Sequence, residues 1–443
     1  MNKEKKAINI VGAGLSGTEI ALYFANKGFN VNLYESKKIK KTPAQTSNNY
    51  SELVCSNSFR GLTNAVGELK NELFILNSEL MNAAQITKVP AGNALAVNRE
   101  DFSKLLTQKL ESHKNIKIIE KEFIKINDNE ITIIATGPLT SDKLINELKT
   151  RIEIGNLHFY DAIAPIVDAS TINYDIAFKA SRWQKGDESE GDYINCPLNK
   201  EEYEDFIEEM QGAQRVELHS FEKYFEACLP VEVMQERSSE QLRYGPMKPI
   251  GLFDPRYPGK RFYAVVQLRM EDKEGKYYNI VGFQTKLKYQ EQKRVFRKIP
   301  GLENVKFIRY GSIHRNTFIN APKILNDDLS VKGYPNLYIT GQLSGVEGYV
   351  ESIAMGMLTA ISIYNRLNGN NNFTFPTQDT ALGALYYHLR NTTKTNFQPS
   401  NINFSLFSGI PLPRKIKKKE KNALRLEYAT NKFKEWVNSQ KIL

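Results

Sequence analysis

Three glycines near the start of the chain have the spacing of a dinucleotide-binding loop. The stretch KAINIVGAGLSGTEI places Gly12, Gly14 and Gly17 directly after a short apolar run. In this pattern the first glycine permits a tight turn, the second lets the backbone approach a pyrophosphate, and the third lets a helix pack against a strand. Glu35 ends the next apolar run, where a carboxylate accepts hydrogen bonds from ribose hydroxyls. These four residues predict a dinucleotide site.

Three cysteines offer a second kind of chemistry. Cys55 lies in SELVCSNS, Cys196 in YINCPL and Cys228 in FEACLPVE. They are too few and too scattered for a disulfide framework or a zinc site, so we expect free thiols in a reducing compartment and no metal. A free thiol is either a nucleophile or a small buried apolar side chain. Cys196, beside a proline and without partner residues, favours the second interpretation.

The glycine loop needs a strand, a helix and a second strand around it. Residues 7–11 form an apolar run, helical spacing follows from Ile20 to Ala25, and residues 31–34 form a second apolar run. The helix N-terminus then directs its partial positive charge at the phosphates. The remaining loop residues that we expect to contact the cofactor are Ala13, Leu15 and Ser16.

Two later glycine-rich segments indicate which dinucleotide is bound. Residues 131–144 begin with an apolar run, which ends in Ala135, Thr136 and Gly137. Residues 337–340 predict a strand, which Gly341 and Gly348 follow before a helix rich in small residues. A late glycine-rich unit fits a flavin better than a nicotinamide, because its helix dipole can face the flavin ring. FAD is therefore the predicted cofactor.

Length and composition set the wider frame. The 443 residues exceed what one core usually holds, so we expect two domains or one domain with an insertion. The 41% hydrophobic and 25% charged shares are typical of a globular protein. No window resembles a membrane span and no signal peptide is recognisable, which predicts a cytoplasmic protein without membrane contact. The net charge of +10 favours a polyanionic partner.

These observations predict an α/β fold with an FAD-binding Rossmann-like domain of the glutathione-reductase type and an inserted α+β domain. Residues 1–190 and 306–443 would form the two parts of the FAD-binding domain. Residues 191–305 would form the insertion. The C-terminal tail begins as a basic run and continues as an amphipathic helix. Its lysines either face solvent or contact RNA.

Many motifs in one order resemble a known family. They include VGAGLSGTE, ELVCSNS, LTNAVG, VPAGNALAVNREDF, IIATGPLT, FEACLPVEVM, YGPMKPIGL, HRNTFINAP and GQLSGVEGYVES. Together they resemble the folate- and FAD-dependent RNA (uracil-5-)-methyltransferases, the TrmFO family, over nearly the whole chain. The resemblance implies an enzyme that takes a methylene group from methylenetetrahydrofolate, uses FAD reduced by NADH or NADPH, and forms 5-methyluridine in RNA.

The resemblance also implies roles for individual residues. A thiolate must add to carbon 6 of uracil before carbon 5 can attack the one-carbon unit. Cys228 matches the family cysteine best placed for this attack, and Cys55 matches a second cysteine near the flavin. Positions that match the flavin and folate pocket are His314, Arg315, Tyr349 and Glu351. The resemblance further implies that the insertion helps to bind RNA. Candidate contacts with the RNA backbone are Arg60, Lys248, Arg269, Lys286 and Lys288.

One departure from the family leaves the RNA target open. Only Phe59, Arg60 and Gly61 separate ELVCSNS from LTNAVG, where the family has a longer loop. A changed rim beside Cys55 keeps the T-loop of tRNA and a uridine of 23S ribosomal RNA as alternatives. Two other classes share the glycine loop: a small-molecule FAD-dependent NAD(P)H oxidoreductase and the larger flavoproteins that modify the wobble uridine. A third alternative is a catalytically inactive RNA-binding module, which requires that the thiols be buried.

Overall fold

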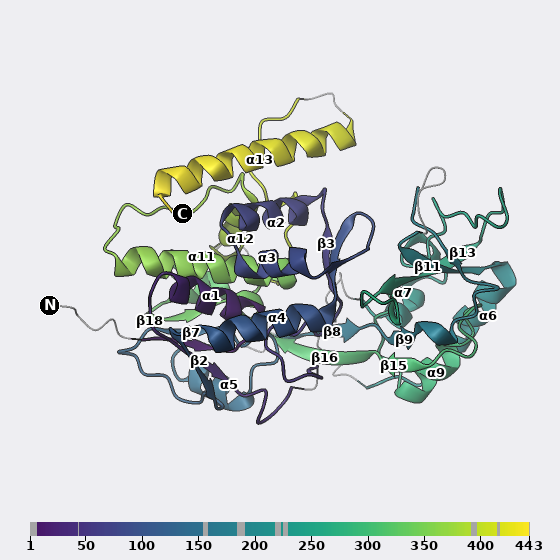
Figure 1. Ribbon diagram of the computed structural model, residues 1–443, viewed down its shortest axis with the longest axis horizontal. Helices are drawn as coiled ribbons and strands as arrows, with labels where there is room; N and C mark the ends of the chain where they lie inside the picture. The colour runs from purple at the N-terminus through teal and green to yellow at the C-terminus, as the bar shows by residue number, and fades with distance from the viewer. Residues whose placement is uncertain are drawn as a thin grey trace.

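A mostly parallel sheet forms the centre of the larger of two units in the computed structural model of the protein (Figure 1). The structure describes residues 7–42, 44–153, 158–183, 191–217, 223–224, 229–390, 397–413 and 417–442. Across the sheet the strands run in the order β17 (Ser330–Val331), β18 (Tyr334–Ile339), β7 (Thr132–Ile134), β1 (Ile8–Val11), β2 (Val31–Glu35) and β6 (Ile116–Glu120). All neighbours are parallel except β17 and β18. The predicted strand, helix, strand unit at the N-terminus is confirmed.

Helices cover this sheet. They are α1 (Leu15–Asn26), α2 (Ala65–Ile75), α3 (Glu79–Ile86), α4 (Arg99–Ser112), α5 (Asp142–Lys149), α10 (Ala321–Ile324), α11 (Tyr349–Leu367), α12 (Ala381–Arg390) and α13 (Lys418–Gln440). The late helix approaches the glycine loop closely, because a Cβ added at Gly356 would lie 2.9 Å from the carbonyl oxygen of Ser16. Helix α11 therefore packs directly against the start of α1.

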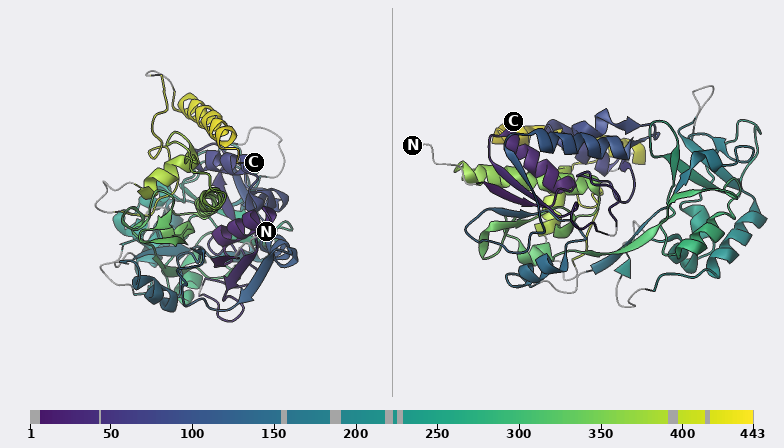
Figure 2. Two further views of the ribbon diagram at one scale, coloured as in Figure 1. Left: turned by 90° about the vertical axis from the view of Figure 1, so that its left-hand side faces the viewer. Right: turned by 60° about the horizontal axis from the view of Figure 1, so that its bottom comes forward.

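The second unit contains its own six-stranded sheet (Figure 2). Its strand order is β10 (Phe178–Lys179), β11 (Tyr193–Leu198), β13 (Ala264–Met270), β14 (Tyr277–Ile280), β9 (Ile166–Asp168) and β15 (Phe307–Arg309). The helices of this unit are α6 (Lys200–Gln211), α7 (Val231–Arg237), α8 (Gln241–Tyr244) and α9 (Tyr289–Phe296). An α+β insertion is therefore present, with a separate core that includes Cys196.

The boundaries of the insertion differ from the predicted 191–305. Strand β9 pairs with both β14 and β15, so this sheet extends from residue 166 to residue 309. The sequence analysis missed β9 and β10 because they are only a few residues long and lie before a polar stretch. Short strands give little periodic signal, and only their hydrogen bonding to distant strands reveals them.

A narrow sheet joins the two units. A second, small sheet supports residues 51–58, the cysteine segment that carries Cys55. The first consists of β12 (Lys223–Tyr224), β8 (His158–Ile163) and β16 (Ser312–Thr317). The second consists of β3 (Ser58–Gly61), β5 (Ala94–Val97) and β4 (Lys88–Val89). In Figure 1, β8 and β16 extend from the larger unit toward the insertion. The strand before the insertion, β8, and the strand after it, β16, therefore lie side by side.

The C-terminal helix is ordered against the larger unit. Helix α13 lies beside α2, where the Thr430 hydroxyl donates to Glu68 over 2.7 Å. On α13 itself, the side chains of Ala429, Phe433 and Val437 are buried, which confirms an amphipathic helix. Among the described residues, no helix is long and apolar enough to cross a membrane.

Candidate functional site

The predicted cofactor residues meet at the carboxyl ends of three neighbouring strands. Register aligns Val11 of β1 with Ile134 of β7, and Ile134 with Ile339 of β18. Gly12, Gly137 and Gly341 follow these ends within three residues. Ligands of open α/β sheets bind at this edge, outside the carboxyl ends of the strands. Three loops that are far apart in sequence therefore form one binding edge.

The three glycines of the first loop differ in what a side chain added there would meet. Gly12 has φ +100°, and an added Cβ would lie 2.7 Å from the carbonyl oxygen of Ala135. A Cβ at Gly17 would overlap the carbonyl oxygen of Gly12. At Gly14, by contrast, no described residue apart from its chain neighbours has an atom within 4 Å of an added Cβ. Gly12 and Gly17 are thus required by packing, while the space at Gly14 is open for a ligand.

A cavity of about 440 Å³ opens beside this loop. Gly12, Gly14, Glu35 and Thr136 line it, together with the start of α5. The Glu35 carboxylate accepts hydrogen bonds of 2.8 Å from the backbone N–H groups of Ala13 and Lys37. It is therefore held at the rim, with lone pairs remaining for ribose hydroxyls.

The loop residues fit the ADP half of FAD. The buried hydroxyl oxygen of Ser16 has no hydrogen-bond partner among the described residues. It lies at the N-terminal turn of α1, whose unpaired N–H groups attract an anion. Buried polar groups are usually hydrogen-bonded, so this orphaned hydroxyl indicates a missing ligand. A pyrophosphate would supply the acceptor.

A second cavity of about 230 Å³ contains five predicted site residues: Cys55, Arg60, His314, Gly348 and Tyr349. Gln284 of the insertion also lines it, so the cavity lies between the two units. Leu139 borders both cavities. A cofactor that extends past Leu139 from the first cavity would reach Cys55 in the second.

Tyr349 holds the cysteine segment in place. Its hydroxyl oxygen accepts hydrogen bonds from the backbone N–H groups of Cys55 and Ser56, over 2.7 and 3.1 Å. Burial raises the pKa of Tyr349 well above its usual range, so the phenol stays protonated. Tyr349 is the first residue of α11, directly after the strained Gly348 (φ +116°). The start of α11 thus fixes the backbone position of Cys55.

Two half-buried arginines interact with the same cysteine. Arg99 donates to the Leu53 carbonyl over 2.6 Å and pairs with Glu271 at 2.8 Å. Arg309 donates to the carbonyl of Ala44, and burial followed by repulsion from Arg99 lowers its pKa. Both guanidinium groups interact electrostatically with Cys55. Positive charge near a thiol in general favours its thiolate form.

His314 contributes a neutral ring to the cavity. Its Nε2 lies 3.0 Å from the Ser312 hydroxyl. Burial, and then the positive charge of Arg309, lowers the pKa of His314. A neutral imidazole can stack on a flat heteroaromatic ring without placing an unpaired charge beside it.

An ion pair joins a buried carboxylate to Arg60, a partly exposed residue that lines this cavity. Glu351 is fully buried, and its Oε1 lies 3.5 Å from Arg60 Nη1. Lys70 of α2, also buried, donates to the carbonyls of Phe59, Arg60 and Gly61 over 2.8 to 2.9 Å. Burial lowers the pKa of Lys70 to about 8. Glu351 pairs with Arg60 and does not itself line this cavity, and its contact with the cofactor stays a prediction.

Other predicted residues lie elsewhere or outside the described chain. Cys228 is not among the described residues, and neither is the side chain of Arg315. Arg269 is buried and donates to Asn57 of the cysteine segment over 3.0 Å, so it joins the units and is not free for RNA. Lys248 and Lys288 are exposed, and Lys286 is half-buried on the insertion.

Sequence reasoning missed Arg99, Arg309, Glu271 and Lys70. Arg99 lies inside the quoted motif VPAGNALAVNREDF, but the motif does not say which side chain it faces. Arg309 and Glu271 carry no motif and come from strands far along the chain. Their role depends on side chains meeting in space. Across the described residues, no cluster of three or more His, Cys, Asp or Glu side chains could hold a metal ion.

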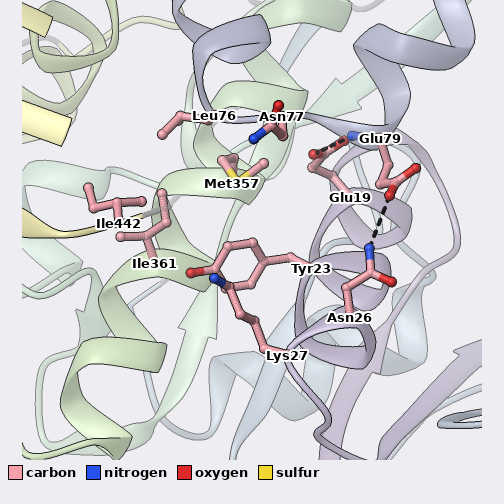
Figure 3. Close-up of a pocket in the computed structure, with 10 residues that line it drawn as sticks. All are labelled: Glu19, Tyr23, Asn26, Lys27, Leu76, Asn77, Glu79, Met357, Ile361 and Ile442. Atoms are coloured by element: carbon pink, nitrogen blue, oxygen red, sulfur yellow. Dashed lines mark hydrogen bonds between the residues drawn. The ribbon is translucent and has the colours of Figure 1, made fainter. Parts of the chain in front are cut away.

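A third cavity, of about 220 Å³, lies away from these residues, between α1, α3 and α11 (Figure 3). Glu19 is buried at its edge and accepts hydrogen bonds from the Ser78 hydroxyl and from the N–H groups of Glu79 and Leu80. Burial raises the pKa of Glu19 to about 7. No predicted site residue lines this cavity, so it is not the site around Cys55.

The fold and the loop at its binding edge define a class: α/β proteins with an FAD-binding Rossmann-like domain and an inserted α+β unit. Residues 7–371 match the family described as glucose inhibited division protein A, GidA. Proteins named methylenetetrahydrofolate--tRNA-(uracil-5-)-methyltransferase TrmFO are similar over nearly their whole length. Those of Natranaerobius thermophilus and Desulfotalea psychrophila are 48% and 50% identical, covering 95% and 98% of this chain and 97% and 99% of theirs. The chain belongs to the GidA family and, within it, to the TrmFO group.

The solved structure of Aquifex aeolicus GidA supports the fold. It matches 99% of this chain and 76% of that chain, with a TM-score of 0.71 and 16% sequence identity. At this identity the likeness concerns the fold alone. The predicted family and fold class are confirmed.

Proposed function

We propose that the protein methylates carbon 5 of a uridine in tRNA, with methylenetetrahydrofolate as carbon donor and FAD as the bound redox cofactor. The observation that carries this proposal is the cavity that joins Cys55, Tyr349 and His314 to the FAD-binding edge through Leu139. Membership of the TrmFO group supplies the reaction and the RNA. The relatives' printed names specify tRNA, and we therefore favour tRNA over 23S ribosomal RNA.

Each part of the cavity has a function in this reaction. The hydride that turns the transferred methylene group into methyl would come from FAD when it is bound and reduced. Cys55 lies where a thiolate can accept or return a proton, because Arg99 and Arg309 stabilise its negative charge. The neutral His314 ring offers a flat face for the pterin. Cys228 remains our proposed nucleophile at carbon 6 of uracil, on the resemblance alone.

NADH or NADPH would reduce the cofactor, and tRNA as substrate implies a cytoplasmic protein. Neither assignment rests on a contact seen in the structure. A redox reaction on a small molecule would need no thiol between arginines beside the cavity, so the Cys55 environment favours the methyltransferase.

The test uses purified protein, methylenetetrahydrofolate labelled at its methylene carbon, and NADH or NADPH in separate reactions. Unmodified tRNA and 23S ribosomal RNA are offered in parallel. We expect label in 5-methyluridine of tRNA, identified by mass spectrometry of digested RNA. Label in ribosomal RNA alone would overturn the choice of tRNA. Oxidation of NAD(P)H without label in either RNA would instead indicate a small-molecule oxidoreductase.

A further inference from the structure

A loop of the insertion exposes large apolar side chains although its neighbours in sequence are buried. Residues 248–261 read KPIGLFDPRYPGKR. Ile250, Phe253 and Tyr257 are more than half exposed, whereas Leu252 and Asp254 are 3% exposed. The buried pair anchors the loop. Burying the three exposed side chains would be favourable, so their exposure points to a partner that covers them.

The exposed residues are held in place before any partner binds. Asp254 pairs with Arg256 at 2.8 Å, and Arg256 also donates to the carbonyls of residues 174–176. Pro249, Pro255 and Pro258 restrict the backbone between these contacts. A surface ordered in this way loses little conformational entropy on binding.

A second segment adds an exposed indole to the same surface. The Trp183 ring is 69% exposed, yet it packs on Gly251, where an added Cβ would lie 2.8 Å from it. Its backbone N–H donates to the Gly251 carbonyl over 2.8 Å. The neighbouring Arg182 donates to the carbonyls of Lys248 and Ile250. Trp183 is thus fixed beside the 248–261 loop.

The charge of this surface selects a polyanion. From residue 243 to residue 261 there are five lysines and arginines and one acid, Asp254, which is buried and paired. Lys260 lies over the Tyr257 ring at 5.2 Å, and Lys248 and Arg261 are exposed. Exposed aromatic rings among cations are the pattern that binds unpaired nucleotides, because bases stack on the rings while cations contact phosphates.

We propose that Trp183, Phe253 and Tyr257 form a stacking surface for unpaired bases of the RNA substrate, with Lys248, Lys260 and Arg261 contacting its phosphates. This inference rests on the proposed function for the identity of the RNA. None of these residues lines the cavity around Cys55. The surface would therefore set affinity for RNA without taking part in the chemistry.

The first test measures steady-state methyl transfer to unmodified tRNA. We expect Phe253→Ala and Tyr257→Ala each to raise KM for tRNA about fivefold or more, with kcat within about twofold of wild type. Tyr387→Ala is the control, because Tyr387 is 42% exposed on α12 in the other unit. An unchanged KM in both loop variants, with folding and methyl transfer intact, would overturn the stacking surface and leave the proposed function standing.

The second test needs no turnover. Binding of tRNA should quench the fluorescence of wild-type protein, and most of that quenching should be lost in Trp183→Phe, since the other tryptophan, Trp436, is buried. Quenching through Trp183 in a protein that never methylates RNA would support the surface and refute the proposed function. Quenching that is equal in both proteins would overturn the surface. A wild-type dimer that Phe253→Ala dissociates would also overturn it, because a second copy would then be the partner.

Discussion

The hydroxyl oxygen of Tyr349 lies 2.7 Å from the backbone nitrogen of Cys55, 294 residues away in sequence. This hydrogen bond links the first turn of α11, at the FAD-binding edge, to the segment that carries Cys55. It gives the phenol a positioning role: the ring lines the cavity, and its oxygen satisfies two backbone donors.

We expect Tyr349→Phe to destabilise the protein by about 1 to 3 kcal/mol, because two backbone donors lose their acceptor. Methyl transfer should fall at least tenfold as the Cys55 segment loosens. Denaturant unfolding and kcat measure the two effects. Tyr338→Phe is the matched control, since the buried Tyr338 hydroxyl has no hydrogen-bond partner among the described residues. Equal effects of the two variants would argue against the positioning role.

Gly14→Val should yield colourless protein that folds normally. No described residue apart from the chain neighbours of Gly14 has an atom within 4 Å of the added Cβ, so the loss would come from a clash with the FAD pyrophosphate. The flavin absorption spectrum and the Tm of apoprotein are the measurements. Gly17 offers no such test, because its added Cβ would overlap Gly12 and disturb the fold itself. A normal flavin spectrum in Gly14→Val would remove the loop from the cofactor site.

The two thiols should differ in trapping experiments. Cys228→Ala should abolish both methyl transfer and covalent capture of RNA carrying 5-fluorouridine, whose fluorine blocks release of the adduct. Cys55→Ala should cripple methyl transfer and leave some capture, because the arginines around it favour a proton-transfer role. Capture is read on denaturing gels. If only Cys228→Ala retains capture, the roles are reversed.

Glu19 should make folding stability fall with rising pH. Burial raises the pKa of Glu19 from 4.5 to about 7. Between these two pH values the folded state therefore holds more protons than the unfolded state. The stabilisation is complete below about pH 4.5 and is lost as the pH rises through about 7. Glu19→Gln removes this titration. The free energy of unfolding of wild type relative to Glu19→Gln should fall by up to about 3 kcal/mol across that window. A difference that stays constant with pH would refute the assignment.

RNA binding should depend strongly on salt. The exposed cations on the insertion would displace counterions, so affinity should fall about tenfold or more between about 50 and 200 mM salt. Fluorescence anisotropy of labelled tRNA measures it. Lys260→Ala combined with Arg261→Ala should make the salt dependence shallower, by about one unit of slope for each phosphate that the variant no longer neutralises. Salt-independent binding would contradict an electrostatic RNA surface.

Local pattern was sufficient for much of this protein. Gly12, Gly14, Gly17 and Glu35 are close in sequence, and their spacing by itself determined the dinucleotide loop, because turn geometry and strand length act over short distances. The later glycine units and the family motifs added the FAD-binding class, the presence of an insertion and the importance of Cys55.

Only the tertiary structure decided what surrounds Cys55 and where the insertion begins. Arg99, Arg309 and Tyr349 come from three distant parts of the chain, and no pattern within any one of them shows that they meet. Arg269 has the sequence character of a surface cation, yet pairing between strands buries it against Asn57. Such contacts depend on how strands register and helices pack across hundreds of residues, which local spacing does not encode.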